Sequence, residues 1–453
     1  MLAAGSLSNS LSRARGLVDD SVSAGCLEPY ADGEELTMSF ARIQCKWSAE
    51  HVPGKVLQSW ERMGDAADRL MYPEPPRQSG LPSLEIFLDR MRRDPSLEVD
   101  QLPAWVDERL LADGMAFFVE AWPLIFVSFG WAVVGGFGCE SASAVLLESR
   151  YWAASGASGR RDTWKRLRET ACWLYDICAP GAQAFEPGGT AWAAALHVRY
   201  LHARTRVELA AKHPGGVLEE FGTPINQLQL VGTLLGSSTL LLQGIECAMG
   251  VPLRVRDKEG FIHLWRLIGH LFGIDDEKNP NRSFAHSVVV MESVFLYAIP
   301  KSPRAHLTQA LTSHIYKAVC QGTKEDFGLP VSESLLAAQA RLYLGRKYSD
   351  DIGLPAVSRI HTLIALLRLA MFRAFFGLYF LLDTTASSGA TSPSRVARLG
   401  AAVHSHGIRL VYRAVMRRSF AALVNSVRAS QPACRFGKSL DSGRSPPLLR
   451  DRI

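Results

Sequence analysis

The sequence predicts an all-α protein, and three observations support that fold class. Strong helix formers dominate the chain, long apolar runs recur with helical periodicity, and alternating runs of β-branched residues are scarce. Hydrophobic residues make up 47% of the 453 residues and charged residues 21%, which is typical of an ordered globular chain. We therefore expect a multi-helix domain that buries a large core.

Breaks in these patterns divide the chain into four parts. Residues 1–100 contain many prolines and are predicted to form an irregular N-terminal lead-in of short helices. Residues 101–382 carry the long periodic runs and are expected to form the helical body. Residues 383–394, rich in Ser and Thr, have the composition of a linker. A basic C-terminal helix and tail are predicted for residues 395–453.

The net charge of +6 is concentrated at the C-terminal end. Residues 395–453 contain twelve Lys or Arg and only two Asp, so the remainder of the chain is slightly acidic. Such a segment is suited to peripheral contact with anionic lipid, and the alternative is a solvated helix face followed by a disordered end. Aromatic residues are sparse there, so we expect no nucleic-acid partner.

One uncharged run, Ala121–Gly138, is long enough to cross a membrane. Its closely spaced glycines suit a membrane bundle and the interior of a large helical protein equally. We interpret the run as a buried core helix in a protein that rests on a membrane surface. No secretory signal is apparent at the start, and eight irregularly spaced cysteines favour a reducing compartment, so we expect an intracellular location.

A polar stripe on one predicted helix is the strongest functional signal. Arg199, His202 and Arg206 stand at i, i+3 and i+7, so they lie on one side of a helix, beside the apolar arc of 194–201. Buried arginines need an anion. A haem supplies an iron for a neutral imidazole and two propionates for the guanidiniums. The alternative is that both arginines pair with Asp or Glu on neighbouring helices.

A second polar group lies upstream. Arg166, Glu169 and Thr170 share one helical face, beside an apolar arc. Such a trio is often a surface ion pair with a bystander hydroxyl. If its helix faces the stripe, the trio would instead present acid–base groups opposite an iron ligand.

Beyond these residues, the order of several motifs resembles the catalytic domain shared by the mpaB-type oxygenases, which are bound to the endoplasmic reticulum, and the rubber oxygenases or latex-clearing proteins. The resemblance covers roughly Trp105 to Leu382. It is carried by Arg166 and Thr170, Pro187–Gly189, the Arg199/His202/Arg206 stripe, Thr223–Gln227, Leu234–Gly236, Trp265–Ile274, Tyr343–Gly345 and Tyr348–Pro355.

The resemblance implies a helical domain with a globin-like core around haem b. It implies His202 as the proximal iron ligand, with Arg199 and Arg206 near the cofactor and Arg166 and Thr170 on the distal side. Rubber oxygenases have a lysine before the distal threonine, where this chain has Glu169. Either the distal iron position is open or water-filled here, or Glu169 acts as a base near dioxygen.

Other histidines of the chain could also bind a haem or a metal. His263 and His270 lie on one helical face and are alternative haem ligands, although such histidines more often form hydrogen bonds inside a core. His404 and His406 are interpreted as surface residues. The sequence contains no Gly-rich phosphate loop, nucleophile elbow or HExxH, which argues against nucleotide, acyl-transfer and zinc-protease chemistry.

Two functions follow from the sequence. The first is a haem b-dependent oxygenase that uses dioxygen on an apolar, isoprenoid-like substrate, with His202 as iron ligand. The second is a catalytically inactive, membrane-associated helical protein of the same fold that binds lipid or a protein partner. Glu169 at the ligand-like position motivates this second hypothesis.

Overall fold

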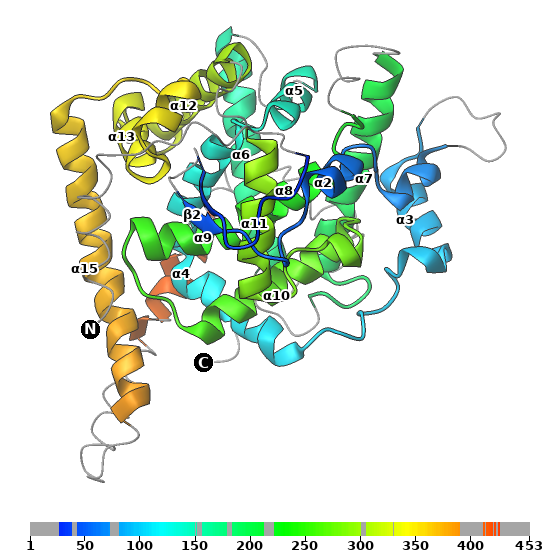
Figure 1. Ribbon diagram of the computed structural model, residues 1–453, viewed down its shortest axis with the longest axis horizontal. Helices are drawn as coiled ribbons and strands as arrows, with labels where there is room; N and C mark the ends of the chain where they lie inside the picture. The colour runs from blue at the N-terminus through cyan, green and yellow to red at the C-terminus, as the bar shows by residue number, and fades with distance from the viewer. Residues whose placement is uncertain are drawn as a thin grey trace.

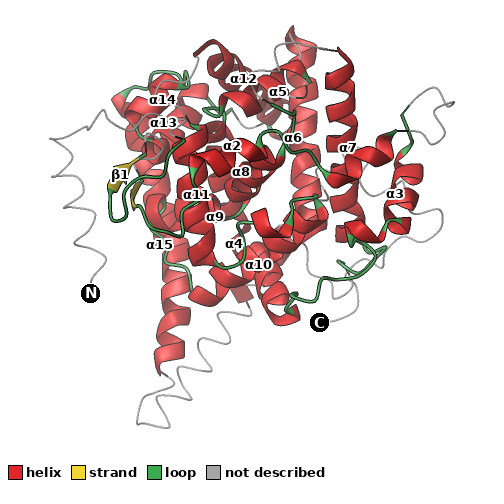
Figure 2. Cartoon of the chain, turned by 45° about the vertical axis from the view of Figure 1, so that its right-hand side comes forward, coloured by secondary structure: helices red, strands yellow, loops and turns green. Residues whose placement is uncertain are grey.

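A computed structural model of the protein confirms the all-α fold class. It describes residues 27–38, 43–72, 81–149, 151, 156–178, 184–212, 222–299, 305–328 and 330–389, with short pieces between 411 and 425. Helices make up most of this part of the chain, and its only strands form a small antiparallel pair, β1 (Glu35–Thr37) and β2 (Gln44–Lys46). Figure 1 shows how the helices pack together, and Figure 2 shows the strand pair at the left edge of the helical body.

The lead-in is a series of short elements that pack against the helical body. It contains β1, β2, α2 (Gly54–Trp60), the 3-10 helix η1 (Ala66–Met71), α3 (Leu84–Arg93) and the 3-10 turn η2 (Pro95–Leu97). Two long-range hydrogen bonds fasten it: the Trp192 indole donates to Val99 O at 2.7 Å, and the Tyr200 hydroxyl donates to Pro82 O at 3.0 Å. Short helices were predicted here, whereas the strand pair was not.

The helical body runs from α4 to α14. Its elements are α4 (Glu108–Gly136), α5 (Glu140–Glu148), α6 (Gly156–Cys178), α7 (Thr190–Lys212), α8 (Gln227–Ser237), α9 (Thr239–Gln243), the π-helical turn η4 (Gly244–Ala248), α10 (Val255–Leu271), the 3-10 turn η5 (Asp276–Lys278), α11 (Phe284–Ala298), α12 (Ala305–Phe327), α13 (Glu333–Leu344) and α14 (Arg346–Asp351). Figure 2 shows α4, α9 and α10 in the middle of this body.

Helices α4 and α10 form the most extensive helix pair in the described chain. Gly114 of α4 faces Gly260 of α10, and a Cβ atom on Gly114 would overlap the Gly260 carbonyl. The two glycines therefore let the backbones approach closely. Around them, Phe117, Phe118 and Phe261 are fully buried, with the Phe117 and Phe261 rings 5.5 Å apart at their centroids. Such aromatic contacts add to the free energy of apolar burial.

Among the described residues, three helical segments are long and apolar enough to cross a membrane. Two of them, Glu108–Gly136 and Gln227–Ala248, are 61% and 78% buried within the protein over their most apolar windows. The run Ala121–Gly138 thus lies mostly in a buried core helix, in agreement with our interpretation. The third segment, Arg359–Gly377, is only 17% buried.

The third segment belongs to α15 (Arg359–Gly389), at the left edge of Figure 1. This helix continues through residues 383–389, which belong to the segment whose composition predicted a linker. Helix formation is cooperative, so an established helix propagates into residues that would not start one. Residues 390–394 and most of the basic segment 395–453 lie outside the described residues, and the proposed division into domains stays a prediction.

Candidate functional site

Helix α7 carries the polar stripe predicted from the sequence. It begins after the turn at Gly188, whose φ of +90° suits glycine, and it runs for 23 residues. Arg199 and Arg206 are almost fully buried, and His202 between them is partly buried. The stripe therefore faces the protein interior, as the adjoining apolar arc indicated.

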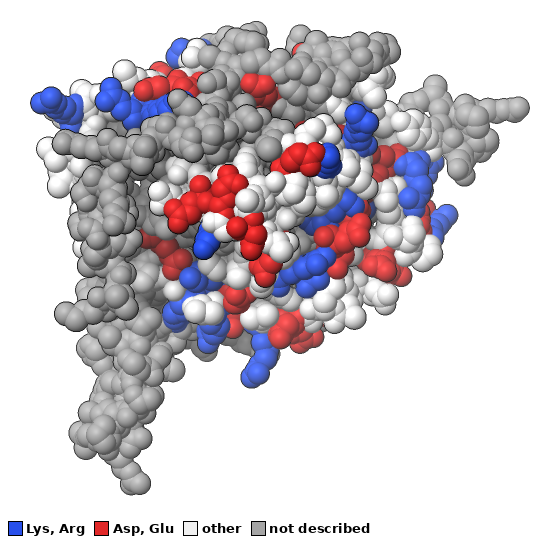
Figure 3. Space-filling view, in the orientation of Figure 1, with Lys and Arg blue, Asp and Glu red and all other residues white. Residues whose placement is uncertain are grey.

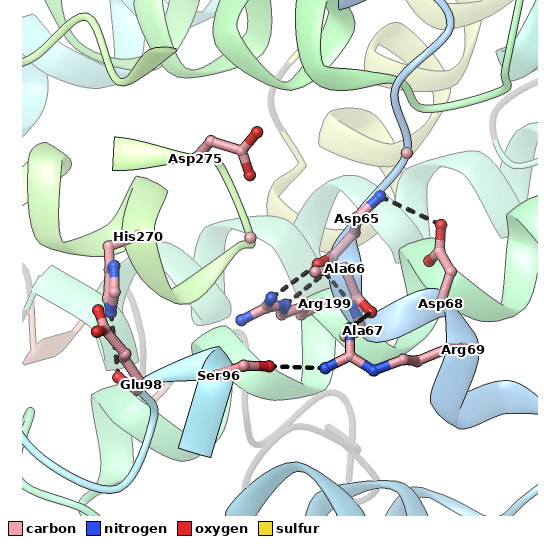
Figure 4. Close-up of polar contacts among 12 residues, drawn as sticks. Asp65, Ala66, Ala67, Asp68, Arg69, Ser96, Glu98, Arg199, His270 and Asp275 are labelled. Atoms are coloured by element: carbon pink, nitrogen blue, oxygen red, sulfur yellow. Dashed lines mark hydrogen bonds and ion pairs between the residues drawn. The ribbon is translucent and has the colours of Figure 1, made fainter. Parts of the chain in front are cut away.

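The Arg199 guanidinium is bound by Asp65 in the lead-in. Nε donates to Asp65 Oδ2 and Nη2 to Oδ1, both at 2.7 Å, and the two side chains are almost completely shielded from solvent (Figure 4). Burial acts to raise the pKa of Asp65, but the charges and hydrogen bonds of Arg199, assisted by Arg206, outweigh it and lower the pKa. Asp65 is therefore a buried carboxylate.

Arg206 is held by the same short segment. Its Nε donates to Asp68 Oδ1 at 2.8 Å, its Nη1 donates to Ile225 O at 2.8 Å, and its Nη2 lies 3.7 Å from Asp65 Oδ2. Asp65 and Asp68 form a capping box at the start of η1, in which the Asp65 side chain accepts from Ala67 N at 3.0 Å. Burial raises the pKa of Asp68 despite the opposing charge of Arg206.

Both arginines are thus neutralised by carboxylates of the chain itself. This arrangement is the ion-pair alternative that the sequence left open, with acids supplied by η1 rather than by a long helix. A cofactor-binding role for Arg199 and Arg206 stays a prediction. Any anionic group that approached them would compete with Asp65 and Asp68, which makes a direct salt bridge to a propionate less favourable.

A further motif residue completes this network. Gln227, at the start of α8, donates to Gly64 O at 3.0 Å and to Gly273 O at 2.8 Å, and accepts from Asp275 N at 3.2 Å. Gly273 has a φ of +83°, and a Cβ atom there would lie 2.5 Å from the Asp65 carboxylate. Gln227 and Gly273, which belong to separate motifs in the sequence, therefore meet around Asp65.

His202 stands beside this network with an unused ring nitrogen. Its Nδ1 is buried and has no hydrogen-bond partner in the part of the chain that the structure describes, which is costly for a polar atom in a protein interior. The ring makes an edge contact with Phe272 at 6.0 Å between centroids, and Phe272 stacks on Trp173 of α6. Desolvation, together with the charge of Arg206 and against the charge of Asp65, lowers the pKa of His202 to about 3. The imidazole is therefore neutral at physiological pH and available to a ligand.

The second predicted group lies on α6, which packs against α7 and α12. The Arg166 guanidinium sits 4.5 Å from the centroid of the Tyr151 ring, and the Thr170 hydroxyl donates to Arg166 O at 2.9 Å. Burial raises the pKa of Tyr151, with the nearby Arg166 opposing and Glu169 reinforcing the shift. Arg166, Glu169 and Thr170 thus surround one tyrosine. Among the described residues, none of the three forms a hydrogen bond with His202, Arg199 or Arg206.

The alternative histidine ligands have structural partners. His263 Nε2 accepts from Asp107 N at 2.9 Å at the start of α4, and His270 Nε2 lies 3.2 Å from Glu98 O. Both rings make edge contacts with Trp105. This is the hydrogen-bonded core role that such histidines usually have. His404 and His406 lie outside the described residues.

Sequence reasoning did not identify Asp65 or Asp68, and it gave Gln227 no role beyond its place in the Thr223–Gln227 motif. Two acids three residues apart at the start of a short helix are a recognisable N-capping signal, but this signal does not say what else the acids bind. Their arginine partners lie more than 130 residues further along the chain. Only the folded topology brings the two segments together.

Comparisons with known proteins agree with the resemblance found in the sequence. Residues 119–377 match the family described as ER-bound oxygenase mpaB/B′/Rubber oxygenase, catalytic domain. A rubber oxygenase from Streptomyces sp. (strain K30) is 27% identical over 294 residues, and the match spans 63% of this chain and 64% of that relative. The chain thus aligns with less than two thirds of the relative's length.

A solved structure of latex clearing protein LCP in the closed state also aligns with the chain. The TM-score is 0.49, the sequence identity is 23%, and the alignment covers 72% of this chain and 79% of that one. The family match includes α6, α7, α8 and α10 and therefore the whole Arg199–His202–Arg206 stripe, while Asp65 and Asp68 precede it. Because this match extends over more than half of the residues, the chain belongs to the family of catalytic domains shared by the mpaB-type oxygenases and the rubber oxygenases.

Proposed function

We propose that the protein is a haem b-dependent oxygenase that acts with dioxygen on an apolar, isoprenoid-like substrate. The observation that carries the proposal is His202, a neutral imidazole with a buried and unpartnered nitrogen on a helix within the family match. A haem, when bound, would supply the redox chemistry that activates dioxygen. The protein supplies the ligand atom, the apolar surroundings and the polar groups beside the substrate.

The residues around His202 fit a haem ligand in two respects. The low pKa keeps the imidazole neutral, which metal ligation requires, and Phe272 with Trp173 provides the apolar shell that excludes water from such a site. Arg199 and Arg206 would support a haem site without the expected direct contact with its propionates. Paired with Asp65 and Asp68, they anchor the helix turns on both sides of His202 and so fix the position of its ring.

Arg166, Glu169 and Thr170 are proposed as the acid–base and positioning groups. Tyr151 holds the Arg166 guanidinium in place by a cation–π contact, which leaves a fixed positive charge on that face of α6. Glu169, which stands where rubber oxygenases have lysine, is suited to accept a proton from the substrate. If Glu169 takes no part, the position opposite His202 is open to a small ligand instead.

Oxygen uptake tests this proposal. Purified protein that has been supplied with haem should consume dioxygen in the presence of an apolar isoprenoid, and His202→Ala should abolish the substrate-dependent uptake. Glu169→Gln should lower the rate by about 10²–10⁴-fold if this carboxylate is the base. Uptake that is equal in wild type and His202→Ala would contradict the proposal.

A second candidate is a membrane-associated helical protein that has the fold without the chemistry, and the surface of α15 favours it. Ile360, Leu363, Leu367 and Met371 of this helix are 57–71% exposed, although the segment is apolar enough to cross a membrane. Exposed apolar surface of this extent marks an interaction site. Together with the basic segment 395–453, it is suited to lie on an anionic membrane.

The two candidates differ in what α15 and His202 each contribute. An inactive lipid-binding protein requires flotation with liposomes by a haem-free protein, whereas an oxygenase that rests on a membrane requires both flotation and haem. Flotation of wild type and of a chain truncated before residue 395, combined with haem content, separates the two. We favour the oxygenase because of the neutral His202 imidazole with its buried Nδ1 atom.

A further inference from the structure

Three metal-ligating side chains meet at the junction between the lead-in and the helical body. Cys45 lies in β2, His51 in the loop that follows it, and Glu292 in α11. Glu292 is 241 residues away from His51 in the chain. The thiol sulfur, an imidazole nitrogen and a carboxylate oxygen all lie within 4.8 Å of one another. Cys45 and His51 are buried, and the Glu292 side chain is only 13% exposed. Segments that are far apart in the sequence thus bring three donor atoms close together.

The charge of Glu292 has no full counter-charge in this environment. Its carboxylate Oε2 lies 3.1 Å from His51 Nε2, and no Lys or Arg forms an ion pair with it in the described part of the chain. A shielded carboxylate is costly unless it is paired with a cation. A bound metal ion would supply that positive charge.

The His51 ring is held in a fixed orientation. It stacks on Trp47 with centroids 4.6 Å apart and an interplanar angle of 25°. Its Nδ1 accepts a hydrogen bond from the Ser48 amide at 3.1 Å, so Nε2 carries the proton and donates to Glu292 Oε2 at 3.1 Å. Metal ligation through Nε2 would move this proton to Nδ1, where Ser48 Oγ at 3.1 Å would accept it. Metal-bound histidines are usually held by a hydrogen bond of this kind on the other ring nitrogen.

The Cys45 thiol is buried beside the Glu292 carboxylate and the His51 ring. A thiol that coordinates a divalent ion loses its proton. Binding would therefore release the Cys45 proton to solvent while a metal–sulfur bond forms, and no redox change is needed.

We propose that Cys45, His51 and Glu292 form a zinc site with three protein ligands and one position left for water. Thiolate, imidazole and carboxylate together are ligands that Zn²⁺ prefers, in contrast to the oxygen-only sets of Mg²⁺ and Ca²⁺. The ion would join β2 to α11 and so fasten the lead-in to the helical body. This site uses no residue of the proposed haem site.

The surface around the site favours the approach of cations. The exposed acids of the strand pair and its flanking loops are Asp32, Glu34, Glu35 and Glu50, with Lys46 among them. Figure 3 shows red acidic side chains gathered over this N-terminal part of the molecule. A surface with an excess of negative charge raises the local concentration of cations.

Metal content of the full-length protein tests the proposal. After removal of metals with a chelator and dialysis against Zn²⁺, the wild type should retain about one zinc per chain. Cys45→Ala and Glu292→Gln should reduce retained zinc to background. Ser48→Ala should weaken binding by about 10–100-fold, as loss of an outer hydrogen-bond partner does. Cys178→Ala, which removes another buried thiol, should leave the zinc content unchanged.

Cobalt provides a second readout that does not depend on variants. Co²⁺ added to the metal-free wild type should give the intense near-ultraviolet absorption of a cobalt–thiolate bond, which is absent for sites without sulfur. A wild type that retains no zinc and gives no thiolate band with Co²⁺ would overturn the proposal. His202→Ala should retain zinc whether or not it binds haem, so failure here is distinguishable from failure of the proposed function.

Discussion

The Arg199 guanidinium forms two hydrogen bonds, both 2.7 Å long, with the carboxylate of Asp65, a residue 134 positions earlier in the chain. This pair joins α7 to η1 and is enclosed by Gly273 and Gln227. The lead-in is therefore part of the site, because it provides the carboxylates that neutralise the polar stripe. His202 is positioned by a helix that is anchored at both ends of the stripe.

Removal of the Asp65 charge should destabilise the protein strongly. Asp65→Asn leaves Arg199 and Arg206 in a buried environment without their shared counter-charge, and the expected loss is about 3–5 kcal/mol in the free energy of unfolding. Urea unfolding followed by circular dichroism measures it. Glu208→Gln breaks the exposed pair with Arg204 and serves as the matched control, with a loss of at most about 1 kcal/mol. Equal effects of the two substitutions would show that the buried pair is not structurally important.

Gly273→Ala should also destabilise the site. The backbone at Gly273 has a φ of +83°, and the added methyl group would lie 2.5–2.6 Å from the three carboxylate atoms of Asp65. We expect a loss of about 1–3 kcal/mol from the backbone conformation alone, and more from the displaced ion pair. Gly130→Ala in α4 is the control, because no atom lies within 4 Å of its Cβ position and alanine favours a helix. A thermal scan should show the two substitutions shifting the melting temperature in opposite directions.

His202 should make stability fall as the pH is lowered. Its pKa is about 3 in the folded protein and 6.5 in the unfolded chain, so the unfolded state binds more protons between these values. The contribution of His202 is therefore fully present above pH 6.5 and is lost progressively toward pH 3, by at most about 1.4 kcal/mol per pH unit. Unfolding of haem-free wild type and His202→Gln at pH 5, 6 and 7 measures it. The difference between the two proteins should shrink as the pH falls, and a constant difference would rule out this titration.

The exposed face of α15 should control membrane binding. Replacement of Leu363, Leu367 and Met371 by Gln removes apolar surface without disturbing the core, so the variant should fold normally and float less with phosphatidylcholine–phosphatidylserine vesicles. Val255→Gln changes an equally exposed apolar residue outside α15 and should float like the wild type. If the triple variant floats unchanged while truncation before residue 395 abolishes flotation, binding depends on the basic segment alone.

The fold class and the buried stripe could be predicted because both depend on local periodicity. Arg199, His202 and Arg206 are placed on one face by helix geometry, and their neighbours Ala194 and Ala195 are buried as that geometry requires. The partners of the stripe could not be predicted. Asp65 caps a short 3-10 helix in a proline-rich region and Asp68 lies in the first turn of that helix, and nothing in their local pattern indicates that α7 passes beside them.

Two further differences have similar physical causes. The 383–389 segment has the composition of a linker, but helix propagation from the long apolar part of α15 carries it into helical geometry. The strand pair of residues 35–46 is too short for alternation to be visible, and it is defined by pairing of Leu36 with Cys45 rather than by propensity. Where local sequence signals are weak, strand pairing and tertiary contacts determine the secondary structure.

The absorption spectrum of the purified protein tests the central claim most directly. After expression with added haem precursor, the wild type should show a Soret band, and His202→Ala should lose it while keeping its helical circular dichroism. His197→Ala, on the same helix, should keep the band. A folded wild type without a Soret band, or a His202→Ala variant with an unchanged one, would contradict the account.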